Sequence, residues 1–199
     1  EGTVSDSTKI SHVGILGPDY IGMKPTMMVE VGDQVKIGSV LFEDKKNPGV
    51  FFTSPAGGLI KSINRGEKRR FISIEIEVAE QENQVEVTND NNEILLRNLS
   101  NYGIINNFRT RPFNKTPKLN DIPNDIFVNI CDTNPLSADP YIYLQHEIDL
   151  FNRSLIKLKE IFNCNIHVCY QSIDFNNFID GINYYNFKGP HPAGLSGTH

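Results

Sequence analysis

The sequence has no long apolar run and no export signal. Its 199 residues include no stretch of about 18 consecutive apolar residues, the length that crosses a bilayer as a helix. A basic segment followed by the apolar core of a signal peptide is also missing. We therefore expect a soluble chain without a transmembrane span of its own.

Cysteine is scarce, and its placement does not indicate a metal site. The chain has three cysteines, Cys131, Cys164 and Cys169, an odd number without a disulfide-framework spacing, which is consistent with a reducing compartment. Cys164, His167 and Cys169 offer at most three ligands, and their spacing matches no usual zinc or cluster pattern. We expect these side chains to be structural and assign no metal.

Concentrated positive charge is also limited. The net charge is −5, and the only cluster of basic residues is Lys68-Arg69-Arg70. Because a nucleic-acid partner requires a larger basic surface, we expect none. The chain lacks a GxSxG nucleophile elbow and a GxGxxG dinucleotide fingerprint, so we assign no catalytic residue.

Short apolar runs separated by turn residues fill the stretch from Lys24 to Arg70. The runs are Met28–Val31, Val35 with Ile37, Val40–Phe42, Val50–Phe52 and Leu59–Ile63. Between them lie Val-Gly-Asp, Ile-Gly-Ser, Asn-Pro-Gly, Ala-Gly-Gly and Arg-Gly-Glu, each with a residue suited to positive or fixed φ. This spacing predicts a compact all-β unit.

Two flanking segments also read as strands. Ile10–Leu16 alternates, with Val13 and Ile15 on one face. The run from 71 to 78 alternates more clearly, and its pattern places Phe71 on the same face as two glutamates that we expect to be solvated. The second of these strands closes the β unit.

The order of glycines in the β unit resembles the lipoyl/biotinyl hammerhead fold. The resemblance is carried by Val29, Gly32, Asp33, Val35, Gly38, Leu41, Ser54, Pro55, Gly58 and Ile60. That family presents a lysine on an exposed hairpin, and Lys45 and Lys46 are the candidates here. Because the tight Asn47-Pro48-Gly49 turn follows them, we favour a structural barrel with solvated lysines.

A longer set of motifs extends the resemblance over nearly the whole chain. They are Gly17–Met23, the barrel core, Leu41–Val50, Ile63–Arg69, Arg109–Phe113, Asp132–Pro140 and Gly189–His199. In this order they resemble the A-subunit family of the Na⁺-translocating NADH:quinone oxidoreductases (Na⁺-NQR). The motifs are long and contiguous, so the resemblance is specific.

The resemblance implies a function for the complex and a supporting role for this chain. The complex passes electrons from NADH through flavins and an iron–sulfur centre to quinone and exports Na⁺. This subunit would be peripheral, on the cytoplasmic side of the bacterial inner membrane, docked on the membrane-embedded subunits. It would bind no cofactor itself, and a quinone contact is possible at the level of the family.

Composition and resemblance together predict a mixed α and β protein in three parts. Residues 1–80 form a lipoyl/biotinyl-like barrel-sandwich hybrid with an N-terminal lead-in, and residues 81–122 form a linker with a short helix at Glu93–Asn101. Residues 123–199 begin an incomplete Rossmann-like α/β domain. We expect the chain to be the N-terminal part of a longer protein.

The α/β part is predicted as a strand–helix–strand unit. Ile126–Ile130 reads as a buried parallel strand, and Ile166–Tyr170 reads as the next strand of the sheet. Between them, Asp139 is placed to cap one helix with Pro140 at its first position. The apolar stripe of that helix is Leu144, Ile148, Phe151, Leu155, Leu158 and Phe162.

Two groups of residues are candidates for a ligand or assembly contact. Ligands of open α/β sheets bind beyond the carboxyl ends of strands, where Asp132, Thr133 and Asn134 lie, although these residues could simply build the turn. Arg109 and Arg111 could clamp an anion, or could tie their loop to nearby carboxylates. His191 completes the set, and neither it nor His199 is assigned a metal.

Two alternatives remain open. One is an Rnf-type electron-transport subunit. Rnf-type subunits and the flavin-binding subunit of respiratory complex I are both relatives of the Na⁺-NQR A-subunit family. Those relatives carry a Gly-rich flavin loop and C-x-x-C-x-x-C cysteine runs, and this sequence has neither. The other alternative is a lipoyl- or biotin-type carrier modified on Lys45 or Lys46.

Overall fold

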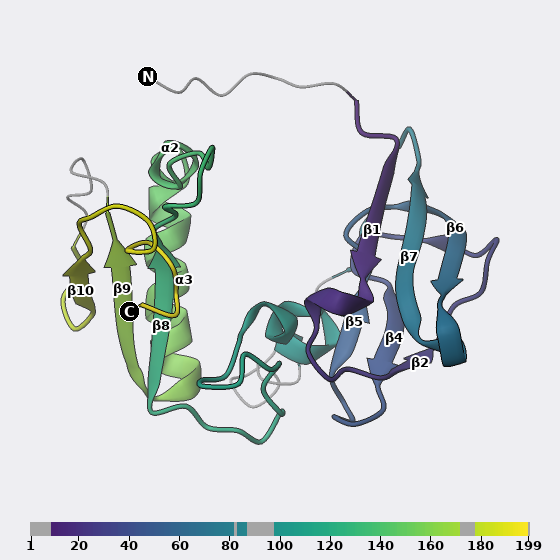
Figure 1. Ribbon diagram of the computed structural model, residues 1–199, viewed down its shortest axis with the longest axis horizontal. Coiled ribbons are helices and arrows are strands. Elements are labelled where there is room, and N and C mark those ends of the chain that lie inside the picture. The colour runs from purple at the N-terminus through teal and green to yellow at the C-terminus, as the bar shows by residue number, and fades with distance from the viewer. Residues whose placement is uncertain (1–8, 82, 87–97, 172–177, 199) are drawn as a thin grey trace. The chain divides into compact units, whose positions relative to one another are not determined.

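The computed structural model describes residues 9–81, 83–86, 98–171 and 178–198 (Figure 1). Contacts along the chain divide it into two compact units. The first, Thr8–Asp121, is called the β unit, and the second, from Ile122 onward, is called the α/β unit. Each is described by itself.

The described residues of the β unit form seven strands in two sheets. They are β1 (His12–Leu16), β2 (Pro25–Met27), β3 (Gln34–Val35), β4 (Val40–Asp44), β5 (Phe51–Thr53), β6 (Gly58–Arg65) and β7 (Phe71–Val78). One sheet has the order β1-β7-β6-β3 and the other β2-β4-β5, and the pairings of these strands are antiparallel. Short 3-10 turns lie at Gly17–Asp19 (η1), Glu67–Arg69 (η2) and Ile104–Asn107 (η3).

Aromatic side chains form the centre of the β unit. The rings of Phe42 and Phe52 stack with centroids 4.6 Å apart, and Tyr20 meets Phe52 edge-on at the same distance. Phe71 packs edge-on against Phe42 at 5.2 Å. Such pairs contribute about 0.5–1.5 kcal/mol beyond the burial of their apolar surface. The expected all-β unit is therefore built around a well-packed core.

Three details of the β unit differ from the sequence pattern. Strand β2 ends at Met27, and the following residues turn because the Glu30 amide donates to the Asp33 carboxylate at 2.7 Å. Phe71 is buried, not outward, because β6 and β7 shift register next to Arg65. In the β6–β7 turn Gly66 has φ −95, so the glycine does not supply the positive φ there.

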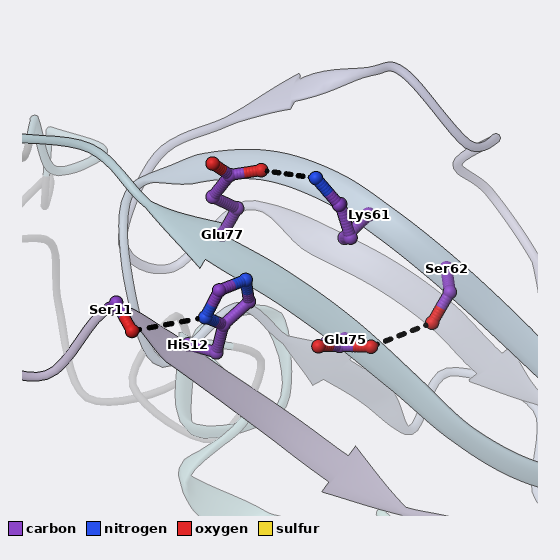
Figure 2. A network of polar contacts seen from close by, with 6 residues as sticks. All are labelled: Ser11, His12, Lys61, Ser62, Glu75 and Glu77. Carbon is purple, nitrogen blue, oxygen red and sulfur yellow. Dashed lines mark hydrogen bonds and ion pairs between the residues drawn. The ribbon is translucent and has the colours of Figure 1, made fainter.

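The outer face of β1, β7 and β6 is polar, as the alternation of β7 predicts. Figure 2 shows Glu77 paired with Lys61 at 2.8 Å, and Glu75 accepting from the Ser62 hydroxyl at 3.1 Å. His12 lies on the neighbouring strand, opposite Glu77 in the register. These contacts stay on an exposed surface, where a single ion pair adds little stability.

The segment after residue 97 packs onto the β4–β5 hairpin. Residues 98–101 are helical, and Gly103 follows with φ +72, as expected for a helix stop. The predicted start of that helix, residues 92–97, lies outside the described residues. The Asn47 side-chain amide donates to the Pro117 carbonyl at 2.9 Å, and the Ser100 hydroxyl donates to the Gly49 carbonyl. The tight turn of this hairpin is therefore covered.

The α/β unit has a parallel sheet with the order β10-β9-β8. Its elements are β8 (Asp125–Ile130), α2 (Tyr141–Leu144), α3 (Ile148–Phe162), β9 (Asn165–Tyr170) and β10 (Asn183–Asn186). Helix α3 lies along one face of the β8–β9 pair (Figure 1). The predicted parallel strand–helix–strand unit is confirmed.

The single helix expected from Asp139 onward is divided in two. The Tyr141 amide donates to the Asp139 carboxylate at 2.9 Å, which caps α2, but α2 ends after one turn. Glu147, at φ −126 and ψ 25, leaves helical geometry, and α3 restarts beyond it. Among the described residues no helix is both long and apolar enough for a bilayer.

Candidate functional site

The loop that follows β8 is built around the carboxylate of Asp132. Its Oδ1 accepts from the backbone amide of Asn134 at 2.9 Å and from the side-chain amide at 2.8 Å. Its Oδ2 accepts from the Ser137 hydroxyl at 2.6 Å. Asp132 and Asn134 therefore form an Asx-type turn, which fixes the shape of the loop.

The same contacts fix the charge of Asp132. The hydrogen bond from Ser137 and the one from the Asn134 amide hold the pKa of this carboxyl below its usual range. The positive charge of a protonated His191 acts in the same direction. Because hydrogen bonds to the ionised form favour it, Asp132 carries a negative charge at neutral pH.

The glycine- and proline-rich segment 188–198 folds back onto this loop. The Gly194 amide donates to the Thr133 hydroxyl at 2.9 Å, and the Asn129 side chain donates to the Gly194 carbonyl at 3.3 Å. His191 Nδ1 lies 3.1 Å from the Thr133 carbonyl oxygen. Since a carbonyl only accepts, Nδ1 donates, and Nε2 is the nitrogen left for a ligand.

A pocket of about 180 Å³ opens beside the loop. Its polar lining consists of Cys131, Asp132, Ser137, Asp139 and Gln171. The volume is below the range of about 300–1,000 Å³ that is typical for drug-sized ligands. The pocket could hold a single ring but not a dinucleotide, and its two carboxylates disfavour a phosphate.

Cys131 contributes a neutral thiol to this pocket. Burial, with a smaller effect of the nearby Cys169, raises the pKa of the Cys131 thiol to about 12. Nucleophilic attack and metal ligation both require the thiolate. At neutral pH the group is therefore a weak hydrogen-bond donor.

Four of the six predicted site residues thus belong to one structure. Thr133 and His191 are in contact, Asp132 and Asn134 are hydrogen-bonded, and the loop joins the two pairs. Asp132 lines the pocket, whereas His191 is not among the described residues that line it. Whether the group contacts a ligand or another protein of an assembly stays a prediction.

Comparison with known proteins agrees with both halves of this architecture. Residues 1–79 match the family model described as the NqrA N-terminal barrel-sandwich hybrid domain. Residues 90–199 match the model described as the NqrA second alpha/beta domain. The chain belongs to the NqrA family.

Curated NqrA relatives are similar along the full sequence. The A subunit of the Na(+)-translocating NADH-quinone reductase of Yersinia pseudotuberculosis serotype O:1b is 43% identical over 208 residues, which is 99% of this chain and 46% of the relative. The protein of the same name from Neisseria meningitidis serogroup B is 45% identical over 210 residues, or 100% of this chain and 46% of that protein. The chain therefore spans about half the length of these relatives.

The NqrA matches confirm the fold class predicted from the sequence. The hammerhead-like barrel-sandwich hybrid corresponds to the β unit, and the Rossmann-like part corresponds to the α/β domain. The resemblance to the A-subunit family is likewise confirmed. The complex named in these relatives is an oxidoreductase that uses NADH and quinone.

Arg109 and Arg111, the two arginines predicted as contact residues of this NqrA chain, lie in the β unit. Arg109 Nη1 donates to the Asn106 carbonyl and, at 2.9 Å, to the Phe108 carbonyl. The guanidinium carbon stands 5.1 Å from the centre of the Tyr20 ring. Arg111 is exposed and precedes a cis peptide bond to Pro112. Arg109 thus stabilises its own loop.

His167, weighed above as a metal ligand, pairs with a carboxylate. Its Nε2 lies 2.8 Å from Asp125 Oδ1, and its ring stacks on Phe127 with centroids 4.8 Å apart. Cys164 and Cys169 are buried. Among the residues that the structure describes, no three His, Cys, Asp or Glu side chains are grouped to hold a metal ion.

Sequence reasoning missed several residues of the site. Among them are Cys131, Ser137, Asp139, Gln171 and Gly194. Ser137 could have been found from the Asp-x-x-x-x-Ser spacing of a loop closed by a carboxylate. Gln171 and Gly194 depend on contacts between distant segments, for which a single sequence gives no signal.

Proposed function

We propose that this chain is part of a peripheral subunit of a Na⁺-translocating NADH:quinone reductase, on the cytoplasmic side of the bacterial inner membrane. It docks on the membrane-embedded subunits and supports electron transfer and Na⁺ export without carrying a redox centre. The observation that carries the proposal is the pair of successive NqrA domain matches, over residues 1–79 and 90–199.

The sequence lacks cofactor-binding motifs, which agrees with a subunit that docks on its partners and carries no redox centre. The sequence has no Gly-rich flavin or dinucleotide loop and no closely spaced cysteine run. NADH, the flavins and the iron–sulfur centre would therefore belong to other subunits or other parts of the complex. We also propose the division into residues 1–80, a linker at 81–122 and an α/β domain from 123 onward.

We further propose that the pocket beside β8 contacts a quinone headgroup. Its size suits one substituted ring, and the Gln171 side-chain amide keeps a donor hydrogen for a quinone carbonyl, while Ser137 lines the pocket and bonds to Asp132. The carboxylates of Asp132 and Asp139 could accept from the hydroxyl groups of the reduced quinol. Arg109 and Arg111 would act outside this pocket, as contacts within the assembly.

Three measurements on the purified chain test the main proposal. We expect an absorption spectrum without flavin or iron–sulfur bands, an unmodified intact mass, and co-purification with the membrane-embedded subunits. Bound flavin would contradict the supporting role. Failure to co-purify with any membrane subunit would contradict docking.

The quinone contact needs a separate experiment. A short-chain, water-soluble quinone should shift the NMR signals of Ser137 and Gln171, and the Ser137→Ala variant should weaken that response. Ser154→Ala, on α3, is the matched control because that hydroxyl donates to the Leu150 carbonyl within the helix. Shifts spread over the whole chain, or equal responses in both variants, would argue against a defined quinone site.

A further inference from the structure

The hairpin between β6 and β7 gathers positive charge on an otherwise acidic chain. Residues 65–70 contain four of the 19 lysines and arginines and one of the 24 acidic residues. This segment, here called the basic tip, carries +3, while the remaining residues carry −8. It overlaps the Ile63–Arg69 motif, which the proposed function does not otherwise use.

The cationic side chains of the basic tip are available to a partner. Arg65, Lys68, Arg69 and Arg70 are all exposed. The ion pairs in the described part of the chain involve other cations, on residues 9, 61, 157 and 167. Within the tip, Arg65 Nη1 donates to the Arg69 carbonyl at 3.4 Å, and among the described residues none of the four cations forms an ion pair.

Two cationic residues of the basic tip have a left-handed backbone conformation that other residues adopt at a lower free-energy cost. Lys68 has φ 52 and Arg69 has φ 60, both in the left-handed region, whereas Gly66 does not. Glycine or asparagine adopts this conformation at lower cost than lysine or arginine. Hydrogen bonds hold the turn, among them Gly66 N to the Arg70 carbonyl at 2.8 Å. A turn optimised for stability alone would not carry these residues.

Exposed apolar side chains lie beside the basic tip. Leu16 is 50% exposed and pairs with Ser73 at the end of the sheet where β7 begins, next to the tip. Ile72 is 39% exposed, and its Cδ1 lies 3.1 Å from the position of a Cβ on Gly66. Cations flanked by exposed apolar groups are typical of surfaces that bind anionic membranes.

We propose that the basic tip, with Leu16 and Ile72, binds the anionic phospholipid headgroups of a membrane surface. This inference rests on the proposed function within a membrane complex. It adds a contact with the lipid surface to the proposed contact with the membrane-embedded subunits. Each lysine or arginine near an anionic surface improves binding about fivefold. A hairpin tip can touch a flat surface with few residues, whereas a long polyanion such as nucleic acid contacts a larger surface, and this chain is acidic outside the tip.

Vesicle flotation tests the proposal without any other protein of the complex. The chain is mixed with phosphatidylglycerol-containing vesicles or with pure phosphatidylcholine vesicles, at low and high salt. We expect binding only to the anionic vesicles, reduced at high salt. The K68E/R69E/R70E variant should lose binding by about a hundredfold or more, given the fivefold effect expected for each of the three charges.

A control variant carries the same change in charge elsewhere. Lys36, Lys45 and Lys46 are exposed lysines of the same unit, and K36E/K45E/K46E should bind the vesicles as the parent chain does. Circular-dichroism melting checks the fold of each variant. If the triple tip variant does not fold, R70E replaces it, because Arg70 has an ordinary extended conformation at φ −60.

Four results would overturn the proposal. They are no preference of the parent chain for anionic vesicles, equal losses in both triple variants, equally strong tip-dependent binding of a single-stranded oligonucleotide, and tip-dependent capture by membrane subunits without vesicle binding. The last result would make the tip a protein contact. If the parent chain fails to bind anionic vesicles but still co-purifies with the membrane subunits, only this proposal is overturned, whereas failed co-purification of the parent chain overturns the proposed function.

Discussion

The amide of Gly194 donates to the hydroxyl of Thr133 at 2.9 Å, and this contact joins segment 188–198 to the loop after β8. Space at this point is limited by backbone atoms. A Cβ on Gly194 would lie 2.7 Å from the Thr133 nitrogen and 3.1 Å from the Asp132 carbonyl carbon. The close approach therefore requires glycine at position 194.

Gly194→Ala should weaken the candidate site. The added methyl group must push the segment away from Thr133, at a cost of about 1–3 kcal/mol in the free energy of unfolding. Urea denaturation measures this change. Gly197→Ala is the matched control, since no atom of the described residues, apart from its chain neighbours, lies within 4 Å of a Cβ there. Equal stability of the two variants would contradict the packing described here.

Ser137→Ala should raise the pKa of Asp132. The Ser137 hydroxyl is the largest cause of the lowered pKa, so its removal should return the carboxyl toward its ordinary value of about 3.9. A depressed pKa stabilises the folded state above the unfolded pKa, and this stabilisation is lost as pH falls through the folded pKa. Part of the acid sensitivity of the parent chain should therefore disappear in the variant.

Carbon-13 NMR of the carboxyl group measures that titration directly. The Asp132 midpoint should move upward in Ser137→Ala and stay unchanged in Ser154→Ala, whose hydroxyl is far from the loop in sequence and bonds within α3. An unchanged midpoint in Ser137→Ala would show that the Asn134 amide alone holds the carboxylate in its ionised form.

Cys131 should resist alkylation in the folded chain. With its pKa near 12, its thiolate fraction at pH 8 is roughly a thousandfold below that of an ordinary cysteine. Iodoacetamide labelling followed by peptide mass spectrometry should therefore find Cys131 unlabelled in buffer and labelled in urea. Burial also raises the pKa of Cys164 and should slow its labelling. Rapid labelling of Cys131 in buffer would disprove the buried, protonated thiol.

Lys45 and Lys46 should remain unmodified when the chain is co-expressed with a lipoyl or biotin ligase. Although both are exposed, the turn that follows them is covered: a Cβ on Gly49 would lie 2.6 Å from Leu119, and Asn47 is bonded to Pro117. A ligase requires an exposed hairpin. Intact-mass measurement provides the test, and an adduct on either lysine would restore the carrier alternative.

Local patterns predicted the elements of this fold well. The strands β8 and β9 follow from short apolar runs, and the inward side of β1 follows from the alternation of Val13 and Ile15. These patterns work because burial on one face of a strand repeats every second residue. The loop after β8 was predictable as a candidate site because ligands meet parallel strands at that end.

The remaining features depend on distant contacts. The apolar periodicity of the sequence does not indicate that the predicted helix is divided at Glu147. It also does not indicate that the Phe71 side chain is buried. Cys131 and Gln171 come together only because β8 and β9 end at the same edge of the sheet. Pairing information of this kind comes from tertiary structure and cannot be read from spacing along one chain.

The pairing of β1 with β7 also determines when the β unit can be completed during synthesis. His12 and Glu77 are partners although 65 positions separate them, so the first strand has no neighbour until the hairpin of β6 and β7 has left the ribosome. Contacts at such separation carry a large loop-closure cost and slow the folding of the chain. Strand β1 therefore stays unpaired in the nascent chain until strand β7 has been made.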